Sequence, residues 1–400
     1  MYYLQNNVEI VSGAKRHCIY NLNTRKLYSL DSDDLALINK VLDGSISDSD
    51  DAQILVQYLL NERILTESNH FLPPFQPVQC GFSADLVWLE ITQNCNLVCH
   101  HCYEGSSRID CKPEMTMEHF TQAVNILKEL NVCHIQLIGG EPLIHSKIEQ
   151  FIKYAANSFS QVEIFTNGTL LTNELLDIIR ECNVSLAFSL YASEPVLHER
   201  VTRTKGSFAL TYQHIKDAIS KGIKVRIASV EMKDVPEFSL DGFFVNRSTD
   251  FPRLTGRADL LLYSRDMLRR KLITKENFKY PIAPDTYYRN KLINNCFGER
   301  LYIDCDLNVF PCAMERRVCY GNLLSESIER ILDNCLAKMN KDKIAGCKDC
   351  EYRYACYDCR CDANNAPIDA KPWYCTYNQD VGEWADVEKF IDLLLQSSVK

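Results

Sequence analysis

Three closely spaced cysteines are the residues with the clearest chemistry in this chain. Cys95, Cys99 and Cys102 follow the spacing C-x-x-x-C-x-x-C directly after an apolar stretch. Three thiolates on one loop can ligate three irons of a [4Fe–4S] cluster and leave the fourth iron open to a small chelating molecule. The alternative is a zinc site with His100 or His101 as fourth ligand, although zinc sites usually pair a C-x-x-C with a distant second pair. An open iron indicates catalysis.

A second and larger group of cysteines lies in the C-terminal third. Two C-x-x-C pairs, Cys347 with Cys350 and Cys356 with Cys359, are separated by only five residues. Zinc ribbons separate such pairs by roughly 15–20 residues, so the tight spacing favours a different metal centre. The other cysteines of this group are Cys296, Cys305, Cys312 and Cys375.

Composition limits the compartment and the partners. The chain has 400 residues, 19 cysteines and a formal net charge of −9. The N-terminus lacks a basic segment followed by an apolar one, and no apolar run is long enough to span a bilayer, so we expect a cytoplasmic chain. Cytoplasmic thiols stay reduced, and a disulfide framework is excluded. The negative charge favours neither nucleic acid nor an anionic membrane surface.

The cysteine loop at residues 95–102 opens a series of alternating strands and helices. A nearly all-apolar strand precedes the loop, which is typical of a strand buried on both faces of a parallel sheet. Repeated βα units predict such a sheet, curled into a partial barrel or open. We expect strands at 86–92, 134–138, 161–166, 184–190 and 223–230, and helices from Thr116 and at 146–157, 173–181 and 209–221.

Polar and glycine-rich segments follow these strands at the ends where a barrel carries its site. The second strand ends in Gly139, Gly140, Glu141 and Pro142, and glycine lets the backbone approach a ligand because it has no Cβ. The later candidates are Asn167 and Ser189 at the ends of the third and fourth strands, and Arg203 in a basic turn.

The cysteine loop, with His101 before its last cysteine and Tyr103 after it, resembles the cluster loop of the radical S-adenosylmethionine (SAM) enzymes. The resemblance implies a partial (β/α) barrel, a [4Fe–4S] cluster that binds SAM, and reductive cleavage of SAM to a 5′-deoxyadenosyl radical. It also implies that the segment from Gly139 to Pro142 contacts the SAM amino group, Ser189 the ribose and Arg203 the carboxylate, with Asn167 in the same site.

The C-terminal cysteines resemble those of the SPASM domain, which holds auxiliary iron–sulfur clusters. The resemblance implies two auxiliary [4Fe–4S] clusters. The chain departs from the family pattern in two places: Leu307 replaces a hairpin glycine, and the gap between Cys356 and Cys359 is one residue short, which leaves Cys361 as a rival ligand. If Cys305 is not a ligand, the first auxiliary cluster has an open iron. The implied ligands are Cys296, Cys312, Cys359 and, as our candidate, Cys305 for the first cluster, and Cys347, Cys350, Cys356 and Cys375 for the second.

Two further segments bear on the domain organisation. Residues 1–80 predict three short strands followed by two helices, which resembles the leader-peptide recognition domain of peptide-modifying enzymes, with a plain structural cap as the alternative. After Val230 the family usually adds a helix and a strand, whereas residues 231–250 show little periodicity. We therefore expect a shortened later wall of the barrel.

These observations predict an α/β chain with a small α+β domain at 1–80, a radical SAM partial barrel at 85–270 and a SPASM-like domain at 271–400. The expected function is maturation of a ribosomally made precursor peptide, with a thioether or carbon–carbon crosslink leading, and with a flavodoxin or ferredoxin as electron donor. Ala313 stands at the position where family members that oxidise sulfatases carry an aspartate as the base. Alanine cannot take a proton, which disfavours sulfatase oxidation. Epimerisation, another radical oxidation of a protein, and a non-catalytic iron–sulfur carrier stay open.

Overall fold

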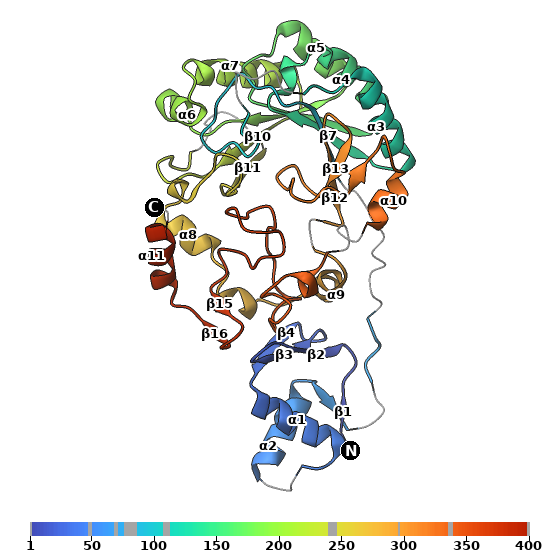
Figure 1. Ribbon diagram of the computed structural model, residues 1–400, viewed down its shortest axis with the longest axis vertical. Coiled ribbons are helices and arrows are strands. Elements are labelled where there is room, and N and C mark those ends of the chain that lie inside the picture. The colour runs from blue at the N-terminus through green and yellow to red at the C-terminus, as the bar shows by residue number, and fades with distance from the viewer. Residues whose placement is uncertain are drawn as a thin grey trace.

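The computed structural model describes residues 2–46, 50–67, 71–75, 86–106, 113–238, 246–294, 297–334 and 339–397. The βα sheet lies at one end of the molecule, the N-terminal residues form a small domain at the other end, and the cysteine-rich C-terminal part lies between them (Figure 1). Within the described ranges, no helix is long and apolar enough to cross a lipid bilayer.

The N-terminal domain has the expected strands and helices. An antiparallel meander of β2 (Val8–Ser12), β3 (His17–Asn21) and β4 (Lys26–Leu30) packs on α1 (Ser32–Asp43) and α2 (Asp50–Asn61). The short strands β1 (Tyr3–Leu4) and β5 (Leu65–Thr66) pair with each other beside them. Gly44 ends α1 in the left-handed region at φ 77°, where glycine has no steric penalty.

Nine strands form one sheet in the order β11-β10-β9-β8-β7-β6-β12-β13-β14, and α3 to α7 lie along one side of it (Figure 1). All neighbouring pairs from β11 to β12 are parallel, while β13 and β14 are antiparallel. The strands are β6 (Leu86–Thr92), β7 (His134–Gly139), β8 (Gln161–Thr166), β9 (Ser185–Ser189), β10 (Val225–Val230), β11 (Asn246–Asp250), β12 (Arg300–Ile303), β13 (Asn308–Phe310) and β14 (Gly321–Asn322).

The helices on this sheet bury one apolar face each against the strands. Thr116 and Thr172 cap α3 and α5 by accepting a backbone N–H three residues on, as the sequence of α3 predicted for Thr116. The eight-residue helix α6 was not expected, although a proline in its first turn is a typical start signal. The helices are α3 (Met117–Glu129), α4 (Ile148–Ala156), α5 (Asn173–Glu181), α6 (Pro195–Thr202) and α7 (Ser207–Ser220), with the 3₁₀ helix η1 (Pro142–Ile144).

The expectation of a shortened later wall was wrong with respect to the strand. β11 pairs in parallel with β10 over five residues, from Arg226 opposite Asn246 to Val230 opposite Asp250. Its sequence, Asn-Arg-Ser-Thr-Asp, is polar, and most of its residues are exposed. An apolar pattern cannot reveal such a strand, because it covers no core on its outer side.

The C-terminal third contributes to two regions. The hairpin of β12 and β13 extends the barrel sheet, because β12 pairs in parallel with β6. α10 (Ile328–Asp333) packs on the core of this sheet through Ile328 and Ile331. The remaining elements lie in the cysteine-rich part: α8 (Arg265–Lys271), α9 (Pro284–Leu292), α11 (Val387–Ser397), β15 (Tyr377–Asn378), β16 (Glu383–Trp384), and the 3₁₀ helices η2 (Leu260–Leu262), η3 (Lys275–Lys279) and η4 (Lys341–Lys343).

The N-terminal domain docks on the loop that carries Cys347, Cys350 and Cys356. The backbone N–H of Ala14 donates to the carbonyl of Asp349 at 2.8 Å, and the Tyr20 hydroxyl donates to the carbonyl of Glu351 at 2.9 Å. The contact is close, since a Cβ on Gly13 would lie 2.8 Å from backbone atoms of this loop. The domain is therefore fastened to the C-terminal cysteines.

Candidate functional site: three cysteine groups around a cavity

Neighbouring elements hold the backbone of the cysteine loop in place. The backbone N–H groups of Gly140 and Glu141 donate to the carbonyls of Thr92 and Asn94, at 2.9 and 2.8 Å. The N–H of His100 donates to a carbonyl at the end of α6, and the Arg257 side chain donates to the carbonyl of Cys99 at 2.8 Å. The loop is thereby held by the segment that follows β7, by the end of α6 and by Arg257.

The loop thiols are free, and they fit the metal centre that their spacing predicted. Cys95, Cys99 and Cys102 are each partly exposed and in the reduced state. Burial raises the pKa of Cys95 to about 12 and shifts the pKa of Cys99 upward as well. Ionisation here therefore needs a strong cation beside the sulfur, and iron bound by the three thiols would supply that charge.

Gly139 and Gly140 are required first by packing within the protein. A Cβ on Gly139 would lie 2.1 Å from the carbonyl oxygen of Thr92, and one on Gly140 would lie 2.4 Å from that of Asn94. These contacts are shorter than any real Cβ contact, so a side chain at either position would push the cysteine loop away. The expected role of the glycines toward a ligand ammonium stays a prediction.

Glu141 is fully buried and ties the cysteine loop to the next strand. Its carboxylate accepts the Thr166 hydroxyl at 2.6 Å, the backbone N–H of Asn167 at 2.7 Å and that of Leu143 at 3.2 Å. Burial raises the pKa of this carboxyl to about 7 in spite of these donors. Pro142 begins the short helix η1 directly after it.

Asn167 also makes its contacts within the protein. Its side-chain amide donates to Asn96 at 2.9 Å, on the cysteine loop, and its oxygen accepts the N–H of Thr169 at 2.9 Å. The end of β8 is thus joined to the cysteine loop by side chains on both segments. Asn167 therefore lies where the sequence predicted, and its observed bonds position the loop.

Ser189 and Arg203 lie in different surroundings. Ser189, at the end of β9, is buried and lines the large cavity described below. Arg203 is exposed and ends α6 at φ 52°, one residue after a carbonyl that accepts the N–H of Val98. The structure therefore brings Ser189 to the cavity wall and leaves Arg203 on the surface beside the cysteine loop.

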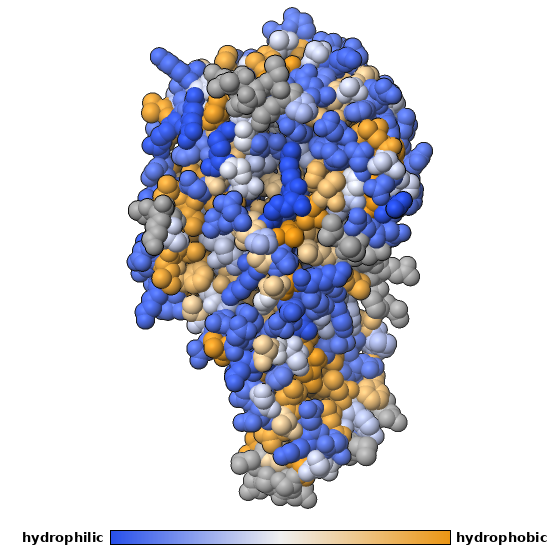
Figure 2. Space-filling model, in the orientation of Figure 1, coloured by the Kyte–Doolittle hydropathy of each residue, from blue (hydrophilic) through white to orange (hydrophobic). Residues whose placement is uncertain are grey.

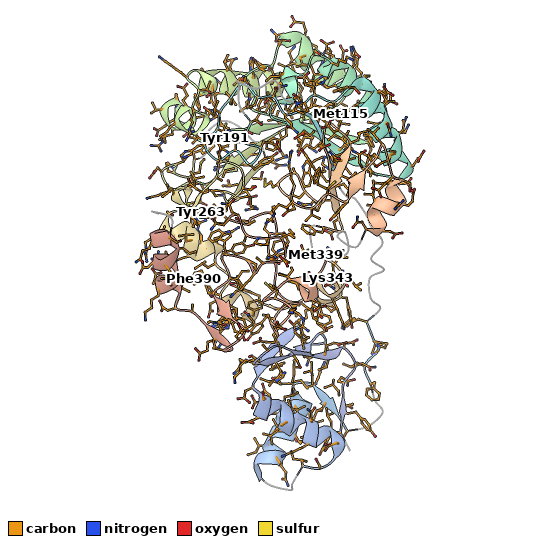
Figure 3. The ribbon with its side chains drawn as sticks, in the orientation of Figure 1. Met115, Tyr191, Tyr263, Met339, Lys343 and Phe390 are labelled. Carbon is orange, nitrogen blue, oxygen red and sulfur yellow. The ribbon has the colours of Figure 1, made fainter. Side chains whose placement is uncertain are left out.

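One cavity of about 690 Å³ lies inside the curved sheet, next to the cysteine loop. His101 and Tyr103 of the loop line it on one side, and Cys312 and Ala313 of the C-terminal part line it on another. The labelled Tyr191 lies on the sheet above the C-terminal part in Figure 3 and belongs to the same wall. The cavity volume is in the range of small-molecule and cofactor sites.

His101 is a neutral aromatic wall of this cavity. Its ring packs edge-on against Tyr191 with centroids 4.6 Å apart. Burial lowers the pKa of His101 to about 3, so the imidazole carries no charge at neutral pH. This agrees with an aromatic rather than an acid–base role for the residue before the last loop cysteine.

A polar ladder crosses the sheet inside the cavity, and the sequence analysis missed it. Trp88, Gln136 and Glu163 are register partners on β6, β7 and β8, and the Trp88 indole donates to Gln136 at 2.8 Å. Arg226 on β10 donates to both carboxylate oxygens of Glu163, at 2.8 and 2.7 Å. The signal was present: charged residues in otherwise apolar strands are costly to bury unless they are paired.

A second buried network joins the cysteine loop to the C-terminal part. Arg316 donates to Glu90 at 2.7 Å, and it also contacts Glu104 and the Tyr302 hydroxyl. Glu90 is fully buried and lies at the end of β6, just before the loop. Arg316 thereby connects segments more than 200 residues apart in the chain.

Cys305, the candidate fourth ligand of the first auxiliary cluster, is buried in the apolar core of the sheet. Its thiol donates to the carbonyl of Glu90 at 3.3 Å, and it packs in the apolar core of the sheet. Cys305 closely follows β12, and β12 joins β6, which carries its side chain into the sheet. Cys296 lies outside the described residues.

Cys312, Cys359 and Cys361 lie together instead. The sulfur atoms of Cys359 and Cys361 are 3.1 Å apart, and Cys361 also hydrogen-bonds to Cys312. The bond from Cys361 lowers the pKa of Cys359 to about 6, with the nearby Arg253 as a further cause. The rival ligand named in the sequence analysis is therefore within this group.

Cys347, Cys350, Cys356 and Cys375 meet around one small hollow, as the sequence predicted for the second auxiliary cluster. Phe278 and Trp384 complete its apolar wall. The hollow measures about 20 Å³. Across the described residues, no three His, Cys, Asp or Glu side chains are arranged to hold a single metal ion.

Comparisons with known proteins agree with this architecture. Residues 89–237 match the Radical SAM superfamily model. The antilisterial bacteriocin subtilosin biosynthesis protein AlbA of Bacillus subtilis is 30% identical over 271 residues, covering 62% of this chain and 59% of AlbA. The AdoMet-dependent heme synthase of Methanosarcina barkeri is 23% identical over 340 residues, covering 73% of this chain and 96% of that protein.

Solved structures show the same fold at low sequence identity. SuiB of Streptococcus suis, in its crystal structure with the precursor peptide SuiA, has 15% identity and a TM-score of 0.52 over 90% of this chain and 96% of that one. Native anSMEcpe with bound AdoMet has 13% identity and a TM-score of 0.51, covering 78% of this chain and 98% of that chain. The chain spans less than two thirds of AlbA, so the likeness to AlbA is partial.

Proposed function

We propose that this chain, whose residues 89–237 belong to the radical SAM superfamily, is a radical SAM peptide maturase with two auxiliary iron–sulfur clusters of SPASM type. The observation that carries the proposal is the shared cavity. The cysteine loop, through His101 and Tyr103, and the C-terminal cysteine Cys312 line the same space of about 690 Å³. A radical source and a redox centre on one cavity suit an oxidative bond-forming reaction.

Cys95, Cys99 and Cys102 would hold the catalytic cluster, which with SAM supplies a 5′-deoxyadenosyl radical able to abstract an unactivated hydrogen. The protein has to position the substrate and exclude water and other hydrogen donors. His101 and Tyr191 contribute an aromatic wall, and the ion pair of Glu163 and Arg226 contributes fixed polar contacts. A flavodoxin or ferredoxin would supply the reducing electron.

The peptide substrate is supported by the relatives and by the N-terminal domain. AlbA takes part in bacteriocin biosynthesis, and SuiB has been crystallised with its precursor peptide. Apolar side chains gather over the N-terminal domain in Figure 2, and Ile54, Tyr58 and Leu37 are 68%, 49% and 43% exposed. Such a surface can hold the apolar side chains of a leader peptide.

A thioether or carbon–carbon crosslink is the proposed product. Ala313 lines the cavity at the place where an aspartate base is expected in sulfatase-oxidising members, and its methyl group cannot take a proton. Epimerisation needs a hydrogen donor beside the substrate radical, and the described thiol next to the cavity, Cys312, is assigned to a cluster. Crosslinking therefore ranks ahead of epimerisation.

Anaerobic co-expression with a candidate precursor peptide tests the proposal, with the product examined by mass spectrometry. A loss of two hydrogens for each modification supports crosslinking, and an unchanged mass with altered stereochemistry supports epimerisation. A reconstituted protein that forms no deoxyadenosine with SAM and dithionite would instead be an iron–sulfur carrier. The variant Ile54→Asp tests the role of the N-terminal domain, because it places a charge on the exposed apolar surface. It should weaken binding of the precursor and leave peptide-free SAM cleavage at its original rate.

A further inference from the structure

Cys361 is buried in surroundings that do not suit an inert thiol. Its side chain is 7% exposed, and its sulfur lies 3.1 Å from that of Cys359 and in hydrogen-bond contact with Cys312. A buried cysteine normally acts as a small apolar side chain. Cys305 does so and belongs to the largest apolar cluster, whereas the apolar clusters of the described residues do not include Cys361.

The residues next to Cys361 hold the segment in one orientation. The Arg360 side chain turns inward and donates to the carbonyl of Ala370 at 2.8 Å. Asp362 accepts the N–H of Leu254 and the indole N–H of Trp373, each at 3.0 Å. With both flanking side chains anchored, the backbone presents the thiols of residues 359 and 361 on the same side.

Cations surround this sulfur group. The Arg253 side chain is 18% exposed and interacts electrostatically with both Cys359 and Cys361, and it lines the cavity beside Cys312. Lys271 pairs with Asp362 at 2.5 Å and adds positive charge near Cys359. Thiolate-ligated iron–sulfur clusters carry net negative charge, which buried cations stabilise.

We propose that Cys361 is an iron ligand of the first auxiliary cluster, in the place that the sequence assigned to Cys305. Cys312, Cys359 and Cys361 are then the ligands from the described residues. The inference rests on the proposed function, because the auxiliary clusters are part of it. With three irons held by these thiols, one iron is left for a further ligand, so substrate has at most one place to bind that cluster.

The test uses the full chain with Cys95, Cys99 and Cys102 changed to alanine, so that only auxiliary iron remains. Iron and sulfide are determined after reconstitution, and the dithionite-reduced protein is examined by electron paramagnetic resonance (EPR). We expect about eight irons per chain in this background. Cys361→Ala should lose about half of the iron together with one EPR signal, and Cys305→Ala should keep both.

Cys361→Ser provides a variant of nearly equal size that is less able to disturb folding. A serine oxygen is a weaker ligand, so we expect a lower iron content or a shifted EPR signal of one cluster. Full iron with an unchanged EPR spectrum in Cys361→Ser, or loss of a cluster in Cys305→Ala but not in Cys361→Ala, overturns the inference. Absence of iron from the background protein itself would contradict the proposed function before Cys361 is at issue.

Discussion

The cysteine loop and the C-terminal cysteine groups differ in how the chain brings their thiols together. In the loop, three thiols lie within eight consecutive residues, and other elements hold the backbone around them. In the C-terminal part, seven of the eight described cysteines between residues 312 and 375 separate into two groups that follow the packing of distant segments, and Cys319 lies in neither group. Local spacing therefore predicts the ligands of the loop, whereas only the folded chain sorts the others.

The two regions also differ in how the protein treats thiol charge. Burial raises the pKa of Cys95 to about 12, while the Cys361 hydrogen bond and Arg253 lower the pKa of Cys359 to about 6. The same hydrogen bonds raise the pKa of Cys361, so the first C-terminal group favours charge on Cys312 and Cys359 over charge on Cys361.

The largest expected effect separates the two regions by function. Cys99→Ala should reduce deoxyadenosine formation by at least about 1000-fold, because SAM loses the cluster that reduces it. Cys375→Ala should keep peptide-free SAM cleavage within about tenfold and abolish peptide modification. Chromatography of deoxyadenosine and mass spectrometry of the peptide measure both. Cys133→Ala is the matched control, since that thiol is exposed and distant from the groups described. If Cys99→Ala and Cys375→Ala reduced deoxyadenosine formation equally, the two regions would not differ in function.

Arg316 tests whether the loop and the C-terminal part are coupled through buried charge. Arg316→Met leaves the fully buried Glu90 without its cation, which should destabilise the protein by roughly 3–5 kcal/mol. The double variant Glu90→Gln/Arg316→Met should recover part of that loss, because it removes the buried charge of Glu90, although Glu104 also loses its contact with Arg316. Denaturant unfolding of the iron-free protein measures both. A double variant as unstable as the single one would argue against charge burial as the cause.

Glu141 gives the loop side a pH dependence. Its folded pKa of about 7 exceeds the ordinary value of 4.5, so the folded state binds a proton more tightly than the unfolded one. Its contribution to stability is complete below pH 4.5 and is lost as the pH rises to about 7, on the order of 2–3 kcal/mol between pH 5 and pH 8. Glu141→Gln should flatten this part of the curve, measured by denaturant unfolding of the iron-free protein. If the stability of Glu141→Gln changed with pH as steeply as that of the original protein, Glu141 would not be the cause of this pH dependence.

The smallest expected effect concerns the docking of the N-terminal domain. The Cβ of Gly13→Val would lie 2.8 Å from the carbonyl oxygen of Asp349, which is too close for an ordinary contact. We expect this clash to reduce the stability of the interface by roughly 1–3 kcal/mol. Hydrogen exchange of residues 347–356 should become faster. Gly44→Asn is the control, because nothing lies within 4 Å of its Cβ position and asparagine tolerates a positive φ. Deletion of residues 1–80 is a poorer test of peptide recognition, since it also uncovers the C-terminal segment that carries Cys347, Cys350 and Cys356.

Much of the barrel was predictable from the sequence. β6 and β8 have the predicted bounds, and β7 and β9 agree within a residue at each end, because their apolar runs fit strands buried on both faces. Helix α7 begins at Ser207 rather than 209 since Gly206 makes the left-handed turn before it, and β10 begins at Val225 after a similar turn at Gly222. β11 escaped prediction because its exposed residues carry no apolar pattern.

The sequence by itself determined the cysteine loop, the strand that leads into it and the segments that meet it, because each depends on residues within one short stretch. Only the tertiary structure places Cys305 and Cys361 in different surroundings. β12 pairs with β6 and carries Cys305 into the apolar core, while anchored Arg360 and Asp362 turn Cys361 toward Cys312, about 50 residues away in the chain. Contacts between distant segments depend on how whole elements pack, and no spacing within the sequence encodes that packing.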